Sequence, residues 1–463
     1  LVAHDAALLA ATPAAVGFTS LPGPKLTTYR ILADYVKEMN DLAKAHPSFV
    51  RLIELPKYTH EDRRVYGLEI AANINAKDGR PTFSVDGLHH AREWPAAEFP
   101  MYFAHDVIER YARGDKQIRS LLGKLRITVI PVVNPDGFHH SRSAPLSQNE
   151  TTAHNTGALG AVGIEGYWRK NRRAVTTIST LPVVQTNPDA YGVDPNRNYG
   201  YLWGDNKGGS SSDITAQTYR GDSPFSEPET LNVRSLLTSR QVTSYLSNHT
   251  SGRLTLRPWG DTRDDAPDEL LLERLGERMS EAMGGYRNIK SIDLYVTTGT
   301  ANDWAYGAMG TLAYVLEHGQ AFHAPYAQAV LPMVSKVVNA YYEAAKTAAD
   351  PKAHGVIVAR VVDKRGRPVR STLSLRKSFA NPMWPNNPAG ITDHPGAVTS
   401  SMTTGSDGRV EWHVNPSTRP IVQQRRGTEA YTITLGAPGA KSVTLPVTVR
   451  RGQKVDLGTI RLG

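Results

Sequence analysis

The sequence predicts an α/β domain with a mixed, mostly parallel twisted sheet flanked by helices, followed by a small all-β sandwich. Three observations predict this architecture. Strand-like and helix-like segments alternate up to about residue 350, which is typical of α/β proteins. Residues 126–133 form a largely apolar run, as expected for a strand buried on both faces of a parallel sheet. After about residue 354, only short alternating segments separated by turns remain, and these favour a sandwich.

Periodicity and turn residues predict the individual elements of the α/β domain. The Asn134-Pro135-Asp136-Gly137 sequence predicts a turn after the apolar strand. Helical spacing predicts helices over 29–45, a segment following Trp94, 227–239, 267–283 and 327–348. Strands are predicted at 50–55, 64–74, 82–86, 126–133 and 312–317.

Three parts of the chain are predicted: an N-terminal arm over 1–28, an α/β domain over 29–350 and a β-sandwich domain over 351–463. The boundary is placed at Asp350-Pro351, where the helical pattern stops. Polar segments at 141–166 and 208–212 predict surface loops. The strands predicted in the last domain are 356–362, 371–375, 409–414, 431–435, 442–449 and 454–462.

Composition excludes several classes of protein. With 463 residues, the chain exceeds what one ordinary core supports. The absence of cysteine excludes disulfides, thiolate metal sites and cysteine nucleophiles. The formal charge of +9 is scattered, so nucleic-acid binding is not indicated. No apolar run reaches the roughly 20 residues of a membrane-spanning helix. Because the chain starts with Leu1 rather than Met, we expect a processed, secreted protein. We also expect a monomer.

The stretch from His89 to Trp94 combines two imidazoles, a guanidinium and a carboxylate directly after a predicted strand. Catalytic groups gather at the carboxyl ends of strands in such sheets. His90 and Glu93 can reach one metal ion at this spacing, and His89 is a competing ligand. A catalytic zinc takes three protein ligands and keeps one open position. His249, which closes a strand-like run at 243–250, is the candidate third ligand, so the pattern predicts a zinc hydrolase.

Residues from roughly 29 to 345 resemble the zinc metallocarboxypeptidases of the funnelin type, the carboxypeptidase A-like M14 family. The match extends over many motifs in the family's order. They are His90-x-x-Glu93 with Arg92 and Trp94, Asn134 to Gly137, Trp168-Arg169-Lys170, Asp194-Pro195-Asn196-Arg197-Asn198, His249, Tyr295, Asp303-Trp304 and Glu317. The last domain resembles the transthyretin-like or regulatory-like modules of some such enzymes, by its β pattern and position alone.

The resemblance implies a carboxypeptidase-like fold and one zinc ion per chain, held by His90, Glu93 and His249. It selects His90 over His89. Asp194 would accept a hydrogen bond from His90 and fix its tautomer. Glu317 would be the general base that activates the zinc-bound water.

The remaining implied roles concern the substrate. Arg169 would stabilise the developing oxyanion. Arg92 would help to hold the substrate, and the terminal carboxylate would be bound by Asn196, Arg197 and Tyr295. The resemblance therefore implies a peptide or protein substrate with a free C-terminus.

Asn302 occupies the position that lines the base of the side-chain pocket in this family. It matches neither the aliphatic nor the acidic pattern there, so we expect a broad or polar-tolerant preference. The segment 250–253 also lacks the aromatic residue common two positions after the third ligand in digestive members.

The predicted site is compatible with three functions. The first is a secreted zinc metallocarboxypeptidase that removes single C-terminal residues. The second is a related zinc amidohydrolase acting on cell-wall or isopeptide-linked peptides, since Asn302 leaves the pocket open. The third is a binding protein that keeps zinc without catalysis, against which the presence of Glu317 argues.

Overall fold

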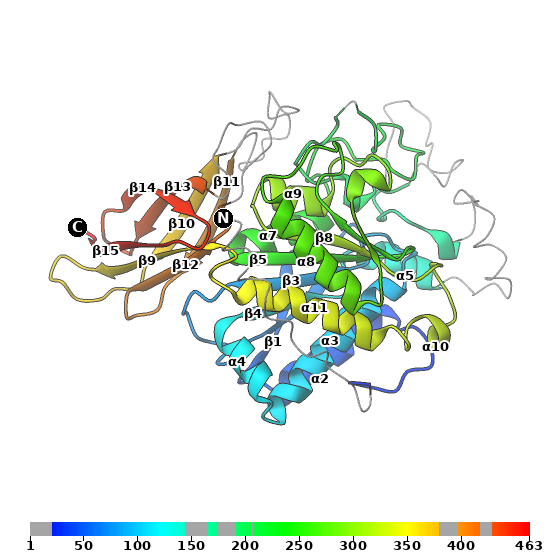
Figure 1. Ribbon diagram of the computed structural model, residues 1–463, viewed down its shortest axis with the longest axis horizontal. Coiled ribbons are helices and arrows are strands. Elements are labelled where there is room, and N and C mark those ends of the chain that lie inside the picture. The colour runs from blue at the N-terminus through cyan, green and yellow to red at the C-terminus, as the bar shows by residue number, and fades with distance from the viewer. Residues whose placement is uncertain (1–20, 144–164, 175–190, 206, 379–396, 417–427) are drawn as a thin grey trace.

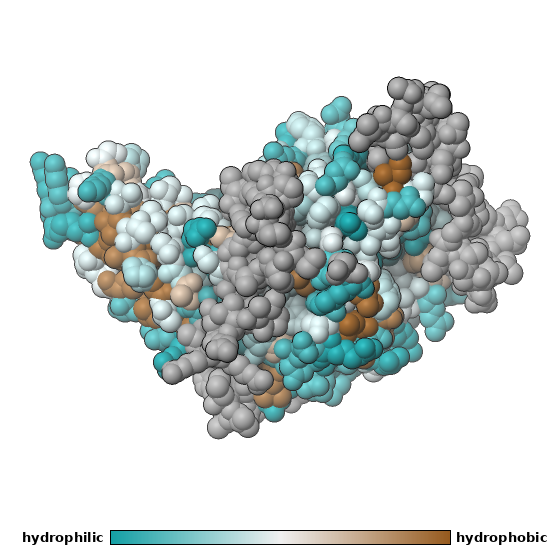
Figure 2. Space-filling model, turned by 90° about the horizontal axis from the view of Figure 1, so that it is seen from above, coloured by the Kyte–Doolittle hydropathy of each residue, from teal (hydrophilic) through white to brown (hydrophobic). Residues whose placement is uncertain are grey.

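A computed structural model describes residues 21–143, 165–174, 191–205, 207–378, 397–416 and 428–463. It contains one eight-stranded sheet with helices packed on it and, at the C-terminus, two smaller sheets that form a separate lobe (Figure 1). This lobe lies at the left of both views (Figure 1; Figure 2). The predicted fold class is confirmed. The N-terminal arm lies mostly outside the described residues, and the loop at 141–166 is described only at its ends.

The large sheet has the order β1-β2-β4-β3-β5-β8-β6-β7. Its central pairs β4/β3, β3/β5 and β5/β8 are parallel, whereas β1/β2, β2/β4 and β8/β6 are antiparallel. The strands are β1 (Val50–Tyr58), β2 (Arg64–Ile70), β3 (Thr82–Gly87), β4 (Arg126–Ile130), β5 (Val242–His249), β6 (Leu254–Arg257), β7 (Arg287–Lys290) and β8 (Leu312–Glu317).

Helices α3, α8 and α11 pack side by side and cover the front of the sheet in Figure 1. Further helices contact the strands at β1, β5 and β8. The helices are α2 (Leu32–Ala45), α3 (Pro95–Ala112), α4 (Lys116–Lys124), α5 (Pro135–Ser143), α7 (Pro228–Ser239), α8 (Glu269–Ala282), α9 (Ala301–Gly307), α10 (Tyr326–Ala329) and α11 (Val334–Ala349), with 3-10 turns at Glu165–Tyr167, Pro195–Arg197 and Ser291–Asp293.

The sheet brings three distant parts of the chain to one edge. In the parallel register, Gly87 at the end of β3 pairs with Asn248, and His249 at the end of β5 pairs with Glu317 at the end of β8. All residues of β3 and β5 are buried, because helices cover the sheet. Polar side chains at or just beyond these strand ends therefore converge on one place, which the buried sheet holds in register.

Several predicted elements differ in detail. The strands predicted at 64–74 and 126–133 already end at Ile70 and Ile130. Asn134 to Gly137 do not form a turn between strand and loop, because Pro135 starts helix α5. Proline suits a first helical position, since its missing N–H would have no partner there. The Asn134 side chain accepts from the Gly137 N–H at 2.9 Å, as a helix N-cap does. The helix predicted over 327–348 is split into α10 and α11.

The C-terminal lobe consists of a four-stranded sheet, β11-β10-β13-β14, and a three-stranded sheet, β12-β9-β15. All its strand pairs are antiparallel except β15/β9. Sequence patterns predicted six of its seven strands and missed β11. The strands are β9 (Gly355–Val362), β10 (Thr372–Ser378), β11 (Ala397–Thr403), β12 (Arg409–Val414), β13 (Thr428–Gly436), β14 (Val443–Arg450) and β15 (Lys454–Arg461).

The C-terminal lobe contacts the large sheet at the end opposite to His249. The Gln241 side chain accepts from the His413 N–H at 2.5 Å, and Asn415 Nδ2 donates to the Val242 carbonyl at 3.0 Å. The lobe has its own cluster of buried apolar side chains, from Ile357 to Leu462. This arrangement favours a domain boundary at Asp350-Pro351, which stays a prediction.

Candidate metal and substrate site

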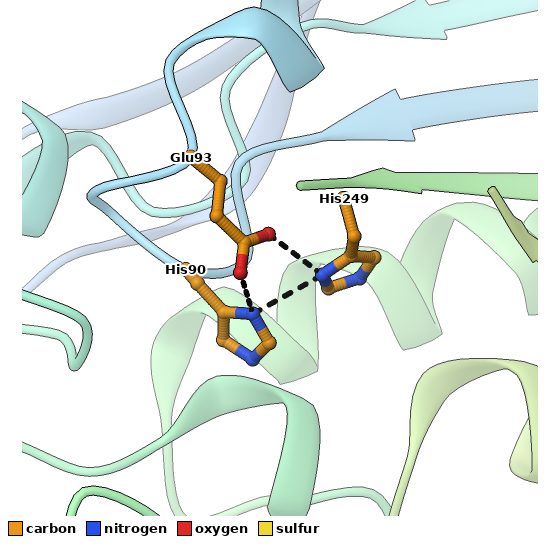
Figure 3. A group of neighbouring side chains, drawn as sticks. All are labelled: His90, Glu93 and His249. Carbon is orange, nitrogen blue, oxygen red and sulfur yellow. Dashed lines mark hydrogen bonds and ion pairs between the residues drawn. The ribbon is translucent and has the colours of Figure 1, made fainter. Parts of the chain in front are cut away.

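His90, Glu93 and His249 converge at the carboxyl edge of the sheet (Figure 3). His90 and Glu93 lie in the short segment between β3 and α3, and His249 ends β5. His90 Nδ1 is 2.7 Å from Glu93 Oε1, His249 Nδ1 is 2.9 Å from Glu93 Oε2, and the two Nδ1 atoms are 3.1 Å apart. Three donor atoms thus face one point, as the sequence predicted, and His89 is not among them.

This donor set fits a zinc ion. His90 Nε2 lies 3.2 Å from Asp194 Oδ1, an ion-pair distance at which the carboxylate favours a ring proton on Nε2 and a lone pair on Nδ1. Burial lowers the pKa of His249, which favours the neutral ring that a metal needs. Two neutral imidazoles and a carboxylate are ligands of a catalytic zinc site.

Asp194 links the metal cluster to Arg169. One oxygen faces His90, and the other accepts from Arg169 Nε at 3.0 Å and Nη2 at 2.8 Å. All three residues are buried. Although burial opposes ionisation, Arg169 and His90 hold the pKa of Asp194 well below its usual range, so Asp194 is a carboxylate here. It fixes both the imidazole and the guanidinium beside it.

Arg92 lies close enough to Arg169 for their two positive charges to repel each other. Arg92 is buried, its cation lies 4.6 Å from the centre of the Phe322 ring, and its Nη1 donates to the Tyr167 carbonyl at 3.4 Å. Burial, and then the charge of Arg169, lower the pKa of Arg92 to about 10. A neighbouring anion would relieve this repulsion.

Arg197 and Asn196 adjoin the cluster on the turn Pro195–Arg197. Asn196 Nδ2 lies 3.5 Å from His249 Nε2. Arg197 donates from Nε to the Gly209 carbonyl at 2.6 Å and from Nη1 to the Asn196 carbonyl at 2.7 Å. Its Nη2 has no hydrogen-bond partner in the described part of the chain. Tyr295 is 49% exposed, and its ring centre is 5.9 Å from the Arg197 guanidinium carbon.

Asn302 lies in the first turn of helix α9, next to Ala301. The Ala301 N–H donates to Asn196 Oδ1 at 2.9 Å, and this hydrogen bond joins the helix to the turn that carries Asn196. Asn302 Nδ2 lies 3.4 Å from Ser291 Oγ and 3.3 Å from Asp303 Oδ1. Burial raises the pKa of Asp303 to about 7, and Asp261 adds to this rise. Asn302 therefore has polar neighbours, and its place at the base of a side-chain pocket stays a prediction.

Glu317 ends β8 directly opposite His249. Burial raises the pKa of Glu317 well above its usual range, and the charge of Glu93 adds to this, while Arg169 and Arg197 act in the opposite direction. Gly252 packs against it, since a Cβ at that position would lie 2.8 Å from Glu317 Cβ. Sequence analysis missed this role of Gly252. Its place just after the His249 strand was the available signal.

A second group of titratable side chains, His60, Glu227 and Glu229, lies at the start of helix α7. His60 Nε2 lies 2.9 Å from Glu227 Oε2, and Asn171 Nδ2 donates to Glu227 at 2.7 Å and to Glu229 at 3.0 Å. Arg173 pairs with Glu227 at 2.9 Å. Burial, with the neighbouring charge of Glu227, raises the pKa of Glu229 to about 8. Glu227 is therefore the ionised member of the pair, and Glu229 carries a proton at neutral pH.

This assignment predicts that Glu229→Gln stabilises the protein at pH 7. A carboxyl whose folded pKa is raised holds its proton while the unfolded state loses it, so stability falls as pH rises from about 4.3 to the folded pKa. The cost at pH 7 is on the order of 3 kcal/mol. Thermal unfolding should show E229Q more stable than wild type at pH 7 and equal to it near pH 4.

The matched variant Glu227→Gln should instead destabilise the protein at pH 7, because it removes the charge that faces Arg173 and His60. If the free energies of unfolding of E229Q and wild type differed by the same amount at every pH between 5 and 8, Glu229 would be ionised in the folded protein. That result would contradict the assignment.

The chain is similar to known zinc carboxypeptidases, in agreement with the zinc-type donor set of the site. Residues 35–340 match the sequence profile described as zinc carboxypeptidase. A zinc carboxypeptidase of Saccharothrix mutabilis subsp. capreolus is 30% identical over 303 residues, covering 63% of this chain and 62% of its own. Zinc carboxypeptidase A 1 of Anopheles gambiae is 26% identical, covering 62% of this chain and 59% of its own. The chain thus spans about three-fifths of the length of these relatives.

Solved structures show the same fold. Carboxypeptidase A from Helicoverpa armigera superimposes with a TM-score of 0.58 at 22% identity, over 75% of this chain and 80% of that one. Bovine thrombin-activatable fibrinolysis inhibitor, in a complex with a tick carboxypeptidase inhibitor, gives a TM-score of 0.56 at 22% identity, over 70% of this chain and 98% of that one. Because the profile covers most of the α/β part, the chain belongs to the zinc carboxypeptidase family, peptidase family M14.

Proposed function

We propose that the protein is a zinc metallocarboxypeptidase that hydrolyses the C-terminal peptide bond of peptides or proteins. The observation that carries this proposal is the buried Arg197, whose Nη2 is left without a partner among the described residues beside the His90, Glu93 and His249 cluster. A guanidinium fork is a strong binder of carboxylates. Only a chain end offers a free carboxylate next to a peptide bond.

In this proposal, His90, Glu93 and His249 hold one zinc ion, which supplies a Lewis acid for the carbonyl and lowers the pKa of water. Arg197, Asn196 and Tyr295 bind the terminal carboxylate, and Arg92 adds positive charge to the pocket. Glu317 takes a proton from the attacking water and returns it to the leaving amine. Arg169, held by Asp194, stabilises the negative charge that develops on the carbonyl oxygen.

The side-chain preference follows from Asn302. Its polar surroundings support the prediction of a broad or polar-tolerant preference, without selection for one charge. The described helices include none that is long and apolar enough to cross a lipid bilayer. An extracellular place of action and a monomeric state stay predictions.

Removal of the metal tests the proposal most directly. We expect His90→Ala to lose bound zinc, and a chelator to abolish release of C-terminal residues from wild type, with activity restored by added zinc. Metal analysis and mass spectrometry of peptide products measure both effects. His46→Ala, which changes a histidine after helix α2 and outside the cluster, should keep its zinc. Full activity in the presence of chelator would contradict the proposal.

The alternative, a zinc amidohydrolase of cell-wall or isopeptide-linked peptides, would use the same metal cluster. It predicts that such substrates are cleaved faster than linear peptides with free C-termini. The binding-only alternative predicts zinc without turnover, and the position of Glu317 opposite His249 argues against it.

A further inference from the structure

His89 is a buried histidine beside the metal cluster that does not belong to it. Its ring stacks on that of His249, with centroids 5.7 Å apart and an angle of 18° between the planes. Both of its nitrogens are engaged: Nε2 lies 2.7 Å from the Tyr199 hydroxyl, and Nδ1 lies 3.2 Å from Ser247 Oγ. Asp86 Oδ1 is farther from Nδ1, at 3.7 Å, so Ser247 is the nearer partner.

Ser247 connects His89 to His249. It lies two residues before His249 on β5, and alternate residues of a strand face the same side of the sheet. Ser247 Oγ is 3.3 Å from His249 Nε2 and 3.2 Å from His89 Nδ1. All three side chains are buried. The hydroxyl therefore bridges the outer nitrogen of the proposed metal ligand and the inner histidine.

If His249 is a zinc ligand through Nδ1, one order of protons satisfies the whole chain from His249 to Tyr199. His249 then carries its proton on Nε2 and donates to Ser247 Oγ. The Ser247 hydroxyl is left free to donate to His89 Nδ1, and His89 donates from Nε2 to the Tyr199 oxygen. In this order His249 Nε2, Ser247 Oγ and His89 Nε2 each meet one acceptor, without a charged group.

We propose that Ser247 and His89 are positioning residues for the metal site, which fix the tautomer and ring orientation of His249. This inference rests on the proposed zinc ligands. The two histidine ligands are then held differently, His90 by the Asp194 carboxylate and His249 by the neutral Ser247–His89–Tyr199 chain. Outer partners of this kind typically change metal affinity by about 10–100-fold when they are removed.

The test measures zinc affinity by competition with a chelator, using the full chain. We expect Ser247→Ala to weaken zinc binding by about 10–100-fold. Ser84→Ala is the matched control, because Ser84 is a fully buried serine on the neighbouring strand β3 whose Oγ has no hydrogen-bond partner among the described residues. It should bind zinc like wild type. His89→Leu, which keeps the ring volume roughly but removes both nitrogens, should weaken binding in the same way as Ser247→Ala.

A second measurement separates positioning from folding. The absorption bands of the cobalt-substituted protein report ligand geometry, and we expect them to change in Ser247→Ala but not in Ser84→Ala. Thermal unfolding of the metal-free variants reports any purely structural effect. Equal zinc affinity and equal cobalt spectra for the two serine variants would overturn the inference. If His249→Ala bound zinc as tightly as wild type, the proposed ligand set itself would be wrong, which is a different failure.

Discussion

Replacing Glu317 with glutamine should lower kcat/KM for peptide hydrolysis by about 10²–10⁴-fold, the usual contribution of a general base. Glutamine has nearly the same shape but cannot take a proton. Glu317 ends strand β8 opposite His249, and burial together with Glu93 raises its pKa well above the usual range. A carboxylate that holds protons so well is an effective base once it is ionised.

Zinc content and KM should stay close to wild type in Glu317→Gln, because Glu317 is not among the three proposed ligands. Glu343→Gln is a suitable control, since Glu343 is a largely buried carboxylate, 15% exposed, that pairs with Arg278. It should keep its activity. Steady-state kinetics on one peptide, with metal analysis of each variant, measure the effect. Full turnover by Glu317→Gln would contradict the role of Glu317 as base.

The position of the candidate metal site could be predicted because two of its ligands are close together in the sequence. His90 and Glu93 are three residues apart just after a strand, and a parallel sheet brings strand ends together. Spacing alone does not decide whether His90 or His89 is the metal ligand, and the resemblance to the family selects His90. The structure supports it geometrically: His89 lies behind the cluster and bonds to Ser247 and Tyr199, whereas His90 Nδ1 faces Glu93.

Other features could not be predicted because they depend on contacts between distant segments. Ser247 and His89 are 158 positions apart in the chain, and only the sheet register brings them together. Asn134 looked like a turn residue, but its Nδ2 donates to the carbonyls of His89 and Lys170, so tertiary bonds place it as a helix cap. Buried hydrogen bonds of this kind outweigh the local preference of these residues for a turn, because a buried polar group without a partner costs free energy.

Replacing Arg197 with alanine should reduce kcat/KM for substrates with a free C-terminus by at least about 30-fold, chiefly through a higher KM. Truncating one side of a buried, hydrogen-bonded charge pair costs about 2–5 kcal/mol, and each 1.4 kcal/mol is tenfold. Arg197 is almost fully buried and is held by two backbone carbonyls, while its Nη2 has no partner among the described residues. Arg278→Ala, which removes a largely buried arginine of helix α8, is the control.

The decisive comparison uses two peptides that differ only at the end, one with a free carboxylate and one amidated. Both present the same scissile bond to Glu317 and the metal site, so any loss of folding or of zinc affects them equally. Wild type should strongly prefer the free acid, and Arg197→Ala should lose most of that preference. An equal loss on both peptides would place Arg197 in the hydrolytic step rather than in carboxylate binding, and efficient cleavage of the amide by wild type would make the enzyme an endopeptidase.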